Sequence, residues 1–248
     1  MKNLKDYDGE IIRKERMQGK LVKQHNSFKF ARPFQVYLGF IKPFKGREVI
    51  YRQGWNDGEL KVHKGSFPDI NLNLDPRGST AMKRSHHPIT EFGFENTIRL
   101  ISKNLRRAVK NGTGDIRISN GGELFGRKVW KIEVRFPMAG RKITVKEDET
   151  LWDVARRTGQ DMYWILYSNQ NKGWEDPDDV DEGDQVFVPW YYGAKAEFFL
   201  DKENGLPVKL VTLDRKGRLY ESYEYPRVRL NPGLTAKDFD PDNEQYDF

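Results

Sequence analysis

Histidines and carboxylates are the residues in this sequence with the most obvious potential for chemistry. His86 and His87 are adjacent, and Asp75 and Glu91 lie near them along the chain. Such a group could bind a metal or transfer a proton. Adjacent residues of an extended strand point to opposite faces, however, so they rarely share one ion. No third and fourth ligand follows at a recognisable spacing. The pattern favours an ordinary polar loop, and we expect no metal and no cofactor.

Motifs for nucleophilic or phosphoryl chemistry are also absent from the sequence. It contains no Gly-X-Ser-X-Gly, P-loop or His-Glu-X-X-His pattern. Asp69 with Asp75, and Glu221 with Glu224, are carboxylate pairs only along the chain. Glycosidase chemistry would need two carboxylates about 5–10 Å apart across a cleft, which sequence spacing does not establish. We therefore expect a protein that is not an enzyme.

Composition indicates a folded protein with a sizeable core. The 248 residues include 15 Phe, 11 Tyr and 6 Trp, which is too many large aromatic side chains for a disordered chain. The absence of cysteine excludes a disulfide framework and thiolate chemistry. No apolar stretch approaches the ~20 residues needed to span a bilayer. Because Met1 is followed directly by polar residues, we expect that a natural export signal is missing from this chain.

The charge pattern argues against nucleic acid as a partner. The net charge is +6, and both signs are mixed along most of the chain. The best candidate for a basic patch lies on one predicted helix and consists of Arg99, Lys103, Arg106, Arg107 and Lys110. At helical spacing these side chains spread around the helix. We interpret them as a solvated helix face, although a basic surface would also suit an anionic polymer or lipid headgroup.

Most of the chain shows the alternation of half-buried antiparallel strands. Alternation is clear at 28–30, 34–40, 48–52 and 128–136, and turn signals such as Asn56-Asp57-Gly58 separate such segments. Thr90 could cap a helix that ends by Asn111-Gly112. After the central block described next, further strands are expected at 196–201, 207–213 and 219–225.

The central block interrupts this β rhythm. A short strand at 143–145 precedes a helix at 150–157, in which Thr150 is the cap and Asp153 stands at the capping-box position. A second helix at 161–168 and a strand at 186–189 complete a β-α-α-β order. We expect Ile143 and Val186 to be neighbours in one small sheet. Insertion at an exposed hairpin tip is the least costly arrangement for such a unit.

This block resembles the LysM family. The resemblance is carried by Ile143-Thr144-Val145-Lys146, Glu149-Thr150-Leu151-Trp152-Asp153-Val154-Ala155, Gly159, Ile165-Leu166, Asn169, and the segment from Val180 through Gly183-Asp184-Gln185 to Pro189. It implies binding of N-acetylglucosamine-containing glycans, chiefly peptidoglycan. The implied groove lies between two loops, and its candidate residues are Asp148, Glu149, Thr150, Leu151, Asn169, Gln170 and Asn171. The sequence departs from the family at Asp148, where glycine is usual, and at Gln170, where proline is usual. The acidic loop from Asp176 to Glu182 is unusual as well.

The flanking segments resemble a family of uncharacterised bacterial envelope proteins that is similar to the LolA/LolB lipoprotein carriers. The marks include Arg32-Pro33-Phe34-Gln35-Val36-Tyr37, Leu74-Asp75-Pro76-Arg77-Gly78, His87-Pro88-Ile89-Thr90-Glu91-Phe92-Gly93 and Leu230-Asn231-Pro232-Gly233-Leu234-Thr235. The resemblance implies a curved antiparallel sheet around a helical lid, with an apolar interior that accepts acyl chains. Candidates for lining this cavity are Phe34, Val36, Leu38, Phe40, Trp130, Ile132, Val134 and Phe136. The alternative is that this apolar face is a filled core.

We therefore expect a mainly β (α+β) protein. A half-open antiparallel β-barrel with a helical lid is formed by residues 1–140 and 191–248, and a βααβ LysM module occupies 141–190. The expected function is a non-catalytic bacterial protein of the periplasm or cell envelope, peripheral to the membrane at most. It would bind peptidoglycan and hold a lipid or lipoprotein acyl chain. Two alternatives are a structural protein with a filled barrel anchored to the wall and, less favoured, a wall-lytic enzyme.

Overall fold

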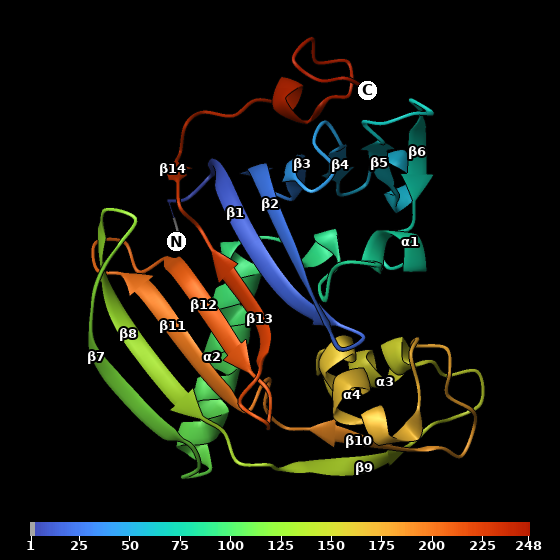
Figure 1. The fold of residues 1–248 in the computed structure, drawn as a ribbon, viewed down its shortest axis with the longest axis vertical. Helices are drawn as coiled ribbons and strands as arrows, with labels where there is room; N and C mark the ends of the chain where they lie inside the picture. Colours follow the sequence, from blue (N-terminus) through green and yellow to red (C-terminus); the bar gives the residue numbers. More distant parts are fainter. Residues whose placement is uncertain (1–2) are drawn as a thin grey trace.

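One large antiparallel sheet organises most of the protein. The computed structural model describes residues 3–248, and Figure 1 shows its fold. Twelve strands join in the order β6-β5-β4-β3-β2-β1-β13-β12-β11-β8-β7, and β14 also pairs with β1. Because β6 and β7 are left as edges, the sheet is open, as the sequence predicted. Its strands are β1 (Asp6–Met17), β2 (Lys20–Ala31), β3 (Gln35–Lys42), β4 (Glu48–Arg52), β5 (Leu60–His63), β6 (Asn71–Leu74), β7 (Asp115–Leu124), β8 (Arg127–Arg135), β11 (Lys195–Asp201), β12 (Pro207–Leu213), β13 (Leu219–Glu224) and β14 (Val228–Leu230).

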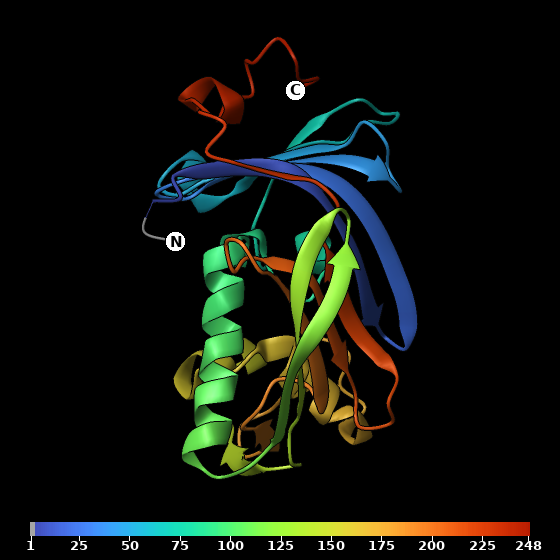
Figure 2. The same cartoon turned by 90° about the vertical axis from the view of Figure 1, so that its left-hand side faces the viewer.

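The sheet bends around helix α2 (Phe94–Lys110), as Figure 2 shows. The long β1–β2 hairpin closes with the two-residue turn Gln18-Gly19, where both residues have positive φ, as such turns require. The buried face of α2 includes Ile101 and Ala108, which pack against Val134 of β8 and other inward residues of the sheet. A helix therefore covers the concave face, as the predicted lid would.

Helix α2 begins later than the sequence predicted. Thr90 does not cap it, because Ile89–Glu91 forms a separate 3-10 turn, η2, and Gly93 is the residue that precedes the first turn. Gly93 has φ +110°, and a Cβ there would lie 2.7 Å from the Tyr7 hydroxyl. This close approach of backbone to β1 sets the helix start, and a capping pattern in the sequence cannot reveal it.

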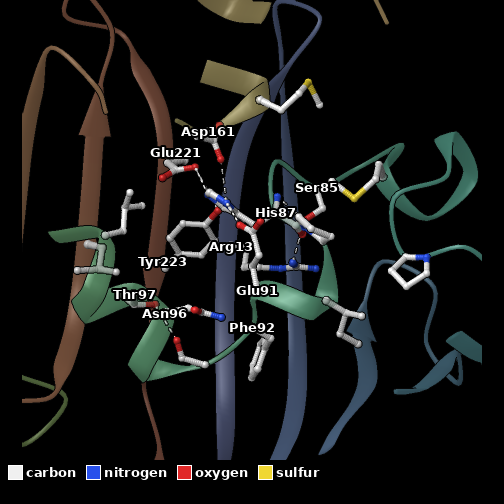
Figure 3. Close-up of a pocket in the computed structure, with 18 of the residues that line it drawn as sticks. Arg13, Ser85, His87, Glu91, Phe92, Asn96, Thr97, Asp161, Glu221 and Tyr223 are labelled. Carbon is white, nitrogen blue, oxygen red and sulfur yellow. Dashed lines mark hydrogen bonds and ion pairs between the residues drawn. The ribbon is translucent and has the colours of Figure 1, made fainter. Parts of the chain in front are cut away.

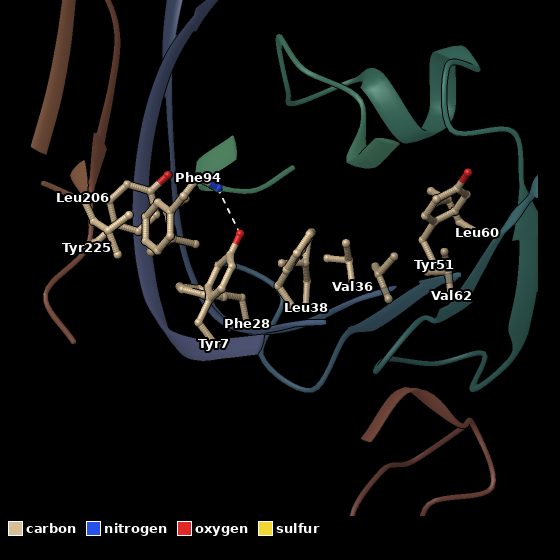
Figure 4. Close-up of a cluster of buried hydrophobic side chains, with 13 residues drawn as sticks. Tyr7, Phe28, Val36, Leu38, Tyr51, Leu60, Val62, Phe94, Leu206 and Tyr225 are labelled. Carbon is tan, nitrogen blue, oxygen red and sulfur yellow. Dashed lines mark hydrogen bonds between the residues drawn. The ribbon is translucent and has the colours of Figure 1, made fainter. Parts of the chain in front are cut away.

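An aromatic cluster holds α2 to the first strands (Figure 4). Tyr7 stacks between Phe30 and Phe94, with ring centroids 4.8 and 4.7 Å away. Its hydroxyl accepts a hydrogen bond from the Phe94 backbone N–H at 2.9 Å. A helix N-terminal N–H has no partner inside its own helix, so this contact satisfies a donor that would otherwise be buried without one.

The central block forms the predicted β-α-α-β unit, here called the inserted module (residues 140–189). It consists of β9 (Gly140–Thr144), α3 (Leu151–Thr158), α4 (Met162–Ser168), the 3-10 turn η3 (Gln170–Lys172) and β10 (Gln185–Pro189). Val186 pairs with Ile143, as predicted, in a two-stranded antiparallel sheet. Thr150 and Asp153 form the predicted capping box. The unit is inserted at the tip of a hairpin, because the strands on either side of it, β8 and β11, pair with each other.

The C-terminal segment covers the outer face of the sheet. It includes the 3-10 turn η4 (Ala236–Phe239) and lies across β3 and β4 at the top of Figure 1. Phe239 is fully buried there, and Tyr246 stacks on Tyr37 with ring centroids 4.3 Å apart. The remaining short elements are η1 (Asn56–Gly58) in the β4–β5 hairpin and α1 (Ser79–Met82) after β6.

Candidate functional site

A cavity of about 780 Å³ lies between the sheet, helix α2 and the inserted module. The sheet contributes residues of β1 to β5 on one side and of β11 to β13 on the other. The segment around η2 and the first turns of α2 form a further wall (Figure 3). The module contributes α3, which includes Trp152, the α3–α4 turn, and Met162 at the start of α4. A cavity of this size is typical of small-molecule sites.

Three of the eight predicted cavity residues line this space, namely Leu38, Phe40 and Phe136. Other apolar lining comes from positions that sequence analysis did not single out. They are Val49, Leu60, Ile89, Phe92, Ala196, Phe198 and Leu210. Their chain separation is large, so only the curvature of the sheet brings them to one space.

The other five predicted residues lie elsewhere. Val36 and Val134 are fully buried within packed core clusters, and Phe34 and Ile132 pack partly buried against the same clusters. These four residues lie in the apolar clusters beside the cavity and are not among its lining residues. Trp130 is 47% exposed, and the Lys202 ammonium lies 4.2 Å from its ring. Trp130 lies on β8 where the strand is open to solvent, and it does not line the cavity.

A network of histidines and carboxylates, buried at His86 and Glu221 and partly exposed at Glu91, forms the polar part of the wall. His87 lies within 3.4 Å of Glu221 through Nε2 and within 3.3 Å of Asp161 through Nδ1 (Figure 3). Glu91 is the third carboxylate around this ring, 3.6 Å from Nδ1. Glu221 also lies 3.1 Å from Nδ1 of His86. The expectation of an ordinary polar loop was therefore wrong.

Tyr223 and Glu15 extend this network toward β1. The Tyr223 hydroxyl donates its proton to Glu15 at 2.5 Å, and its oxygen also lies 3.2 Å from Glu221. His86 stacks on Tyr220, with centroids 4.3 Å apart and planes 14° from parallel. Glu15, His86 and Glu221 come from distant parts of the chain, so no sequence spacing could have indicated the cluster.

The charges in this network stabilise one another. Burial disfavours the charged forms, but the carboxylate of Glu221 and its neighbours raise the pKa of His87 well above its ordinary value. Burial also opposes ionisation of Glu221, yet the facing His87 and hydrogen bonds from both histidines hold its pKa well below the usual range. Asp161 differs, because burial outweighs the attraction of His87 and raises its pKa to about 6. The wall thus holds an imidazolium–carboxylate pair beside a carboxyl group that titrates near neutrality.

Two groups of side chains here have the types and spacing of metal ligands. In one, Glu15, His86 and Glu221 offer ligand atoms within 4.8 Å of one another, and in the other His87, Glu91 and Asp161 do so. The same atoms already satisfy one another as ion pairs and hydrogen bonds. The expectation of no metal stays a prediction.

Three arginines that line the cavity, Arg13, Arg47 and Arg84, have no carboxylate partner among residues 3–248. Arg13 donates to Ser85 at 3.3 Å and to Gln24, both neutral groups. Arg47 and Arg84 both place their guanidinium groups against Phe44, 4.2 and 4.9 Å from its centroid. No local sequence pattern indicates these residues, because their convergence depends on the turn after β3 meeting the segment after α1.

The predicted glycan-binding residues of the module fall into two groups. Leu151 and Asn169 are buried, with exposed fractions of 0% and 3%. The Asn169 side chain is used internally, since it donates to the carbonyls of Ile165 and Phe187 and accepts from Phe187 N–H. Both side chains therefore have a structural role in the module, and their predicted contact with a glycan stays a prediction.

The remaining five include both capping and exposed residues. Thr150 is committed to the α3 cap, and Glu149 pairs with Arg157 at 2.7 Å. Asp148, Gln170 and Asn171 are exposed. The loop after Glu149 is tied to the acidic loop by the hydrogen bond from Leu151 N–H to the Pro177 carbonyl, at 2.9 Å.

The predicted solvated face of α2 is partly a contact with the module. Lys103 donates to the Gly159 carbonyl in the module, and Arg107 donates to the carbonyl of Trp190, the residue that follows the module, at 2.5 Å. Trp164 of α4 is buried against Tyr192 and Tyr220 and donates from Nε1 to the Tyr191 carbonyl at 2.8 Å. The module is therefore docked on the helix and sheet at several points.

A comparison with protein-family models identifies the family of this chain. The model described as "Protein of unknown function (DUF1571)" matches residues 4–168 and 189–248. The chain belongs to the DUF1571 family. The match omits residues 169–188. In this DUF1571 protein they follow α4 and include all of β10 except Pro189. Among curated proteins, none matches the chain.

Several solved structures are similar to this DUF1571 protein at low identity. A DUF1329 family protein from Desulfovibrio piger is 10% identical, with a TM-score of 0.38 over 96% of this chain and 90% of that one. A LolA superfamily protein from Nitrosomonas europaea is 9% identical, with a TM-score of 0.32 over 96% and 91%. The MucA/MucB complex of Pseudomonas aeruginosa is 13% identical, with a TM-score of 0.42 over 95% of this chain and 55% of that one. The chain thus spans about half the length of that last structure. Such similarity concerns the fold alone.

The helices give no indication of a membrane span. Among residues 3–248, no helix is both long and apolar enough to cross a bilayer.

Proposed function

We propose that this DUF1571 protein is a non-catalytic protein of the bacterial envelope that holds an acyl chain of a lipid or lipoprotein in its central cavity. The observation that carries the proposal is the cavity of about 780 Å³, whose apolar lining comes from both halves of the curved sheet. A single acyl chain has a volume of several hundred Å³, which is within the range of ligand cavities.

The distribution of lining residues supports an amphiphile over a wholly apolar ligand. Leu38, Phe40, Val49 and Leu60 on one side, and Ala196, Phe198 and Leu210 on the other, provide contact for methylene groups. Between them lie charged and hydroxyl groups such as Arg13 and Tyr223. Burial of a CH₂ group contributes roughly 0.8 kcal/mol, so a chain of ordinary length would bind strongly even if only half of it entered.

Occlusion of the cavity tests this proposal. Ala81 of α1 lines the cavity and is partly exposed, so Ala81→Trp should fill space without disturbing a strand. We expect at least about tenfold weaker binding of a fluorescent fatty acid, because the indole would displace several methylene groups. Ala236→Trp, at an exposed position of η4 outside the cavity, is the matched control. Equal affinity for both variants would place the ligand outside this cavity.

We further propose that the inserted module binds peptidoglycan. The support is its βααβ topology, its capping box and the exposed Asp148, Gln170 and Asn171 on two of its loops. Amide side chains can donate to and accept from the acetamido groups of a glycan. The protein would then be held at the cell wall while its cavity carries a lipid. A filled anchor protein without a lipid ligand is the alternative that the cavity disfavours.

Retention on insoluble peptidoglycan tests the second proposal. The intact protein should sediment with purified peptidoglycan, and Gln170→Ala with Asn171→Ala should reduce the bound fraction severalfold, because each lost amide removes hydrogen bonds to the sugar. Gln18→Ala, in the exposed β1–β2 turn, is the control. If the intact protein is not retained, the module is a packing element and not a tether.

A further inference from the structure

Two arginines and a phenylalanine line the cavity near the turn between β3 and β4. Phe44, Arg47 and Arg84 all line the cavity. Phe44 is 36% exposed, and Arg84 is exposed, so this group lies where the cavity meets solvent. It comprises two cations on one aromatic ring, and together these three residues are here called the arginine pair site.

Both guanidinium groups lie against the ring of Phe44. The Arg47 and Arg84 Cζ atoms lie 4.2 and 4.9 Å from the Phe44 centroid, and Arg47 also lies 5.8 Å from the ring of Phe40. Burial and then the charge of Arg84 lower the pKa of Arg47. Like charges repel, whereas the face of an aromatic ring attracts a cation, so the contacts with Phe44 and Phe40 favour both guanidiniums in these positions.

Neither arginine is neutralised by the protein itself. Among residues 3–248, the arginines in ion pairs are others, namely Arg32, Arg117, Arg156, Arg157, Arg218, Arg227 and Arg229. The Nε atom of Arg47 is buried and has no hydrogen-bond partner in the described part of the chain. A buried donor without a partner is uncommon and costly, and an anion bound at the Arg47 guanidinium would satisfy it.

Backbone contacts fix the turn that carries Phe44 and Arg47. The turn from Phe44 to Arg47 is closed by a hydrogen bond from Arg47 N–H to the Phe44 carbonyl at 3.0 Å. The β5–β6 loop lies directly against it, since a Cβ on Gly65 would fall 2.3 Å from the Gly46 carbonyl carbon. The site is therefore held by two loops in contact, which makes it preorganised for a ligand.

We propose that Arg47 and Arg84 bind the anionic headgroup, a phosphate or carboxylate, of the amphiphile whose chain occupies the cavity. This inference rests on the proposed function, and it adds the class of ligand. Guanidinium groups suit these anions because their paired N–H groups match two oxygens of one phosphate or carboxylate. The headgroup would stay at the solvent boundary while the chain lies between the two halves of the sheet.

Calorimetric titration with three probes tests the inference on the intact protein. The probes are lysophosphatidic acid, a neutral monoacylglycerol with the same acyl chain, and inorganic phosphate. We expect lysophosphatidic acid to bind about tenfold or more tightly than the monoacylglycerol, because charge-assisted hydrogen bonds are stronger than neutral ones. Arg47→Gln with Arg84→Gln should abolish this difference and leave monoacylglycerol binding nearly unchanged. Arg106→Gln with Lys110→Gln, exposed on α2 and outside the cavity lining, is the control pair.

The outcomes separate this inference from the proposed function. Equal binding of both acylated probes, or an advantage that survives the arginine substitutions, overturns the headgroup site while the acyl cavity stands. Failure of both acylated probes to bind overturns the proposed function, and the inference falls with it. Phosphate binding as tightly as lysophosphatidic acid would identify a site for a free anion and overturn the lipid form of the proposal.

Discussion

At the scale of single residues, His87 is the side chain on which the buried network depends. It lies against Glu221, Asp161 and Glu91, which together raise its pKa well above the ordinary 6.5. A folded-state pKa above the unfolded one means that the stabilisation is complete below about pH 6.5 and is lost as pH rises toward the folded-state value. We therefore expect His87→Gln to lower the free energy of unfolding by more at pH 6.5 than at pH 9, as measured by urea denaturation. An equal loss at both pH values would show that the ring acts by packing and not by charge.

At the scale of elements, the start of α2 is set by one glycine. Gly93 has φ +110°, and a Cβ would lie 2.7 Å from the Tyr7 hydroxyl and 3.2 Å from the Phe30 ring. Gly93→Ala should lower the free energy of unfolding by about 1–3 kcal/mol, because both the backbone and the neighbours must adjust. Gly112→Ala is the comparison at the other end of α2, where φ is +59° and no atom lies within 4 Å of a Cβ. A smaller loss at Gly112, measured by urea denaturation, is expected, and the reverse order would contradict this account of the helix start.

At the scale of the whole molecule, the inserted module is both an appendage and a wall of the cavity. Gly140 pairs with Pro189, so residues 141–189 can be replaced by two glycines without separating β8 from β11. We expect this variant to bind a fluorescent fatty acid several-fold more weakly, because Trp152, Met162 and their neighbours no longer shield the chain from water. Circular dichroism would verify that the sheet is retained. Unchanged affinity in a folded variant would mean that the module takes no part in lipid binding.

The sequence by itself determined the local elements. Alternation predicted the antiparallel strands, and the capping pattern at Thr150 and Asp153 predicted α3, because both signals depend on residues within a few positions of each other. The open form of the sheet was implied only by the resemblance to the LolA/LolB carriers. It also predicted that Ile143 pairs with Val186, since a small inserted unit must bring its ends together. Only the tertiary structure decided which apolar residues line a cavity, so that Leu38 does and Val36 does not. The bending of the sheet also brought Glu15, His86 and Glu221 into one network, and the packing of loops placed both Arg47 and Arg84 against Phe44. These groupings depend on distances between segments far apart in the chain, which local sequence patterns do not encode.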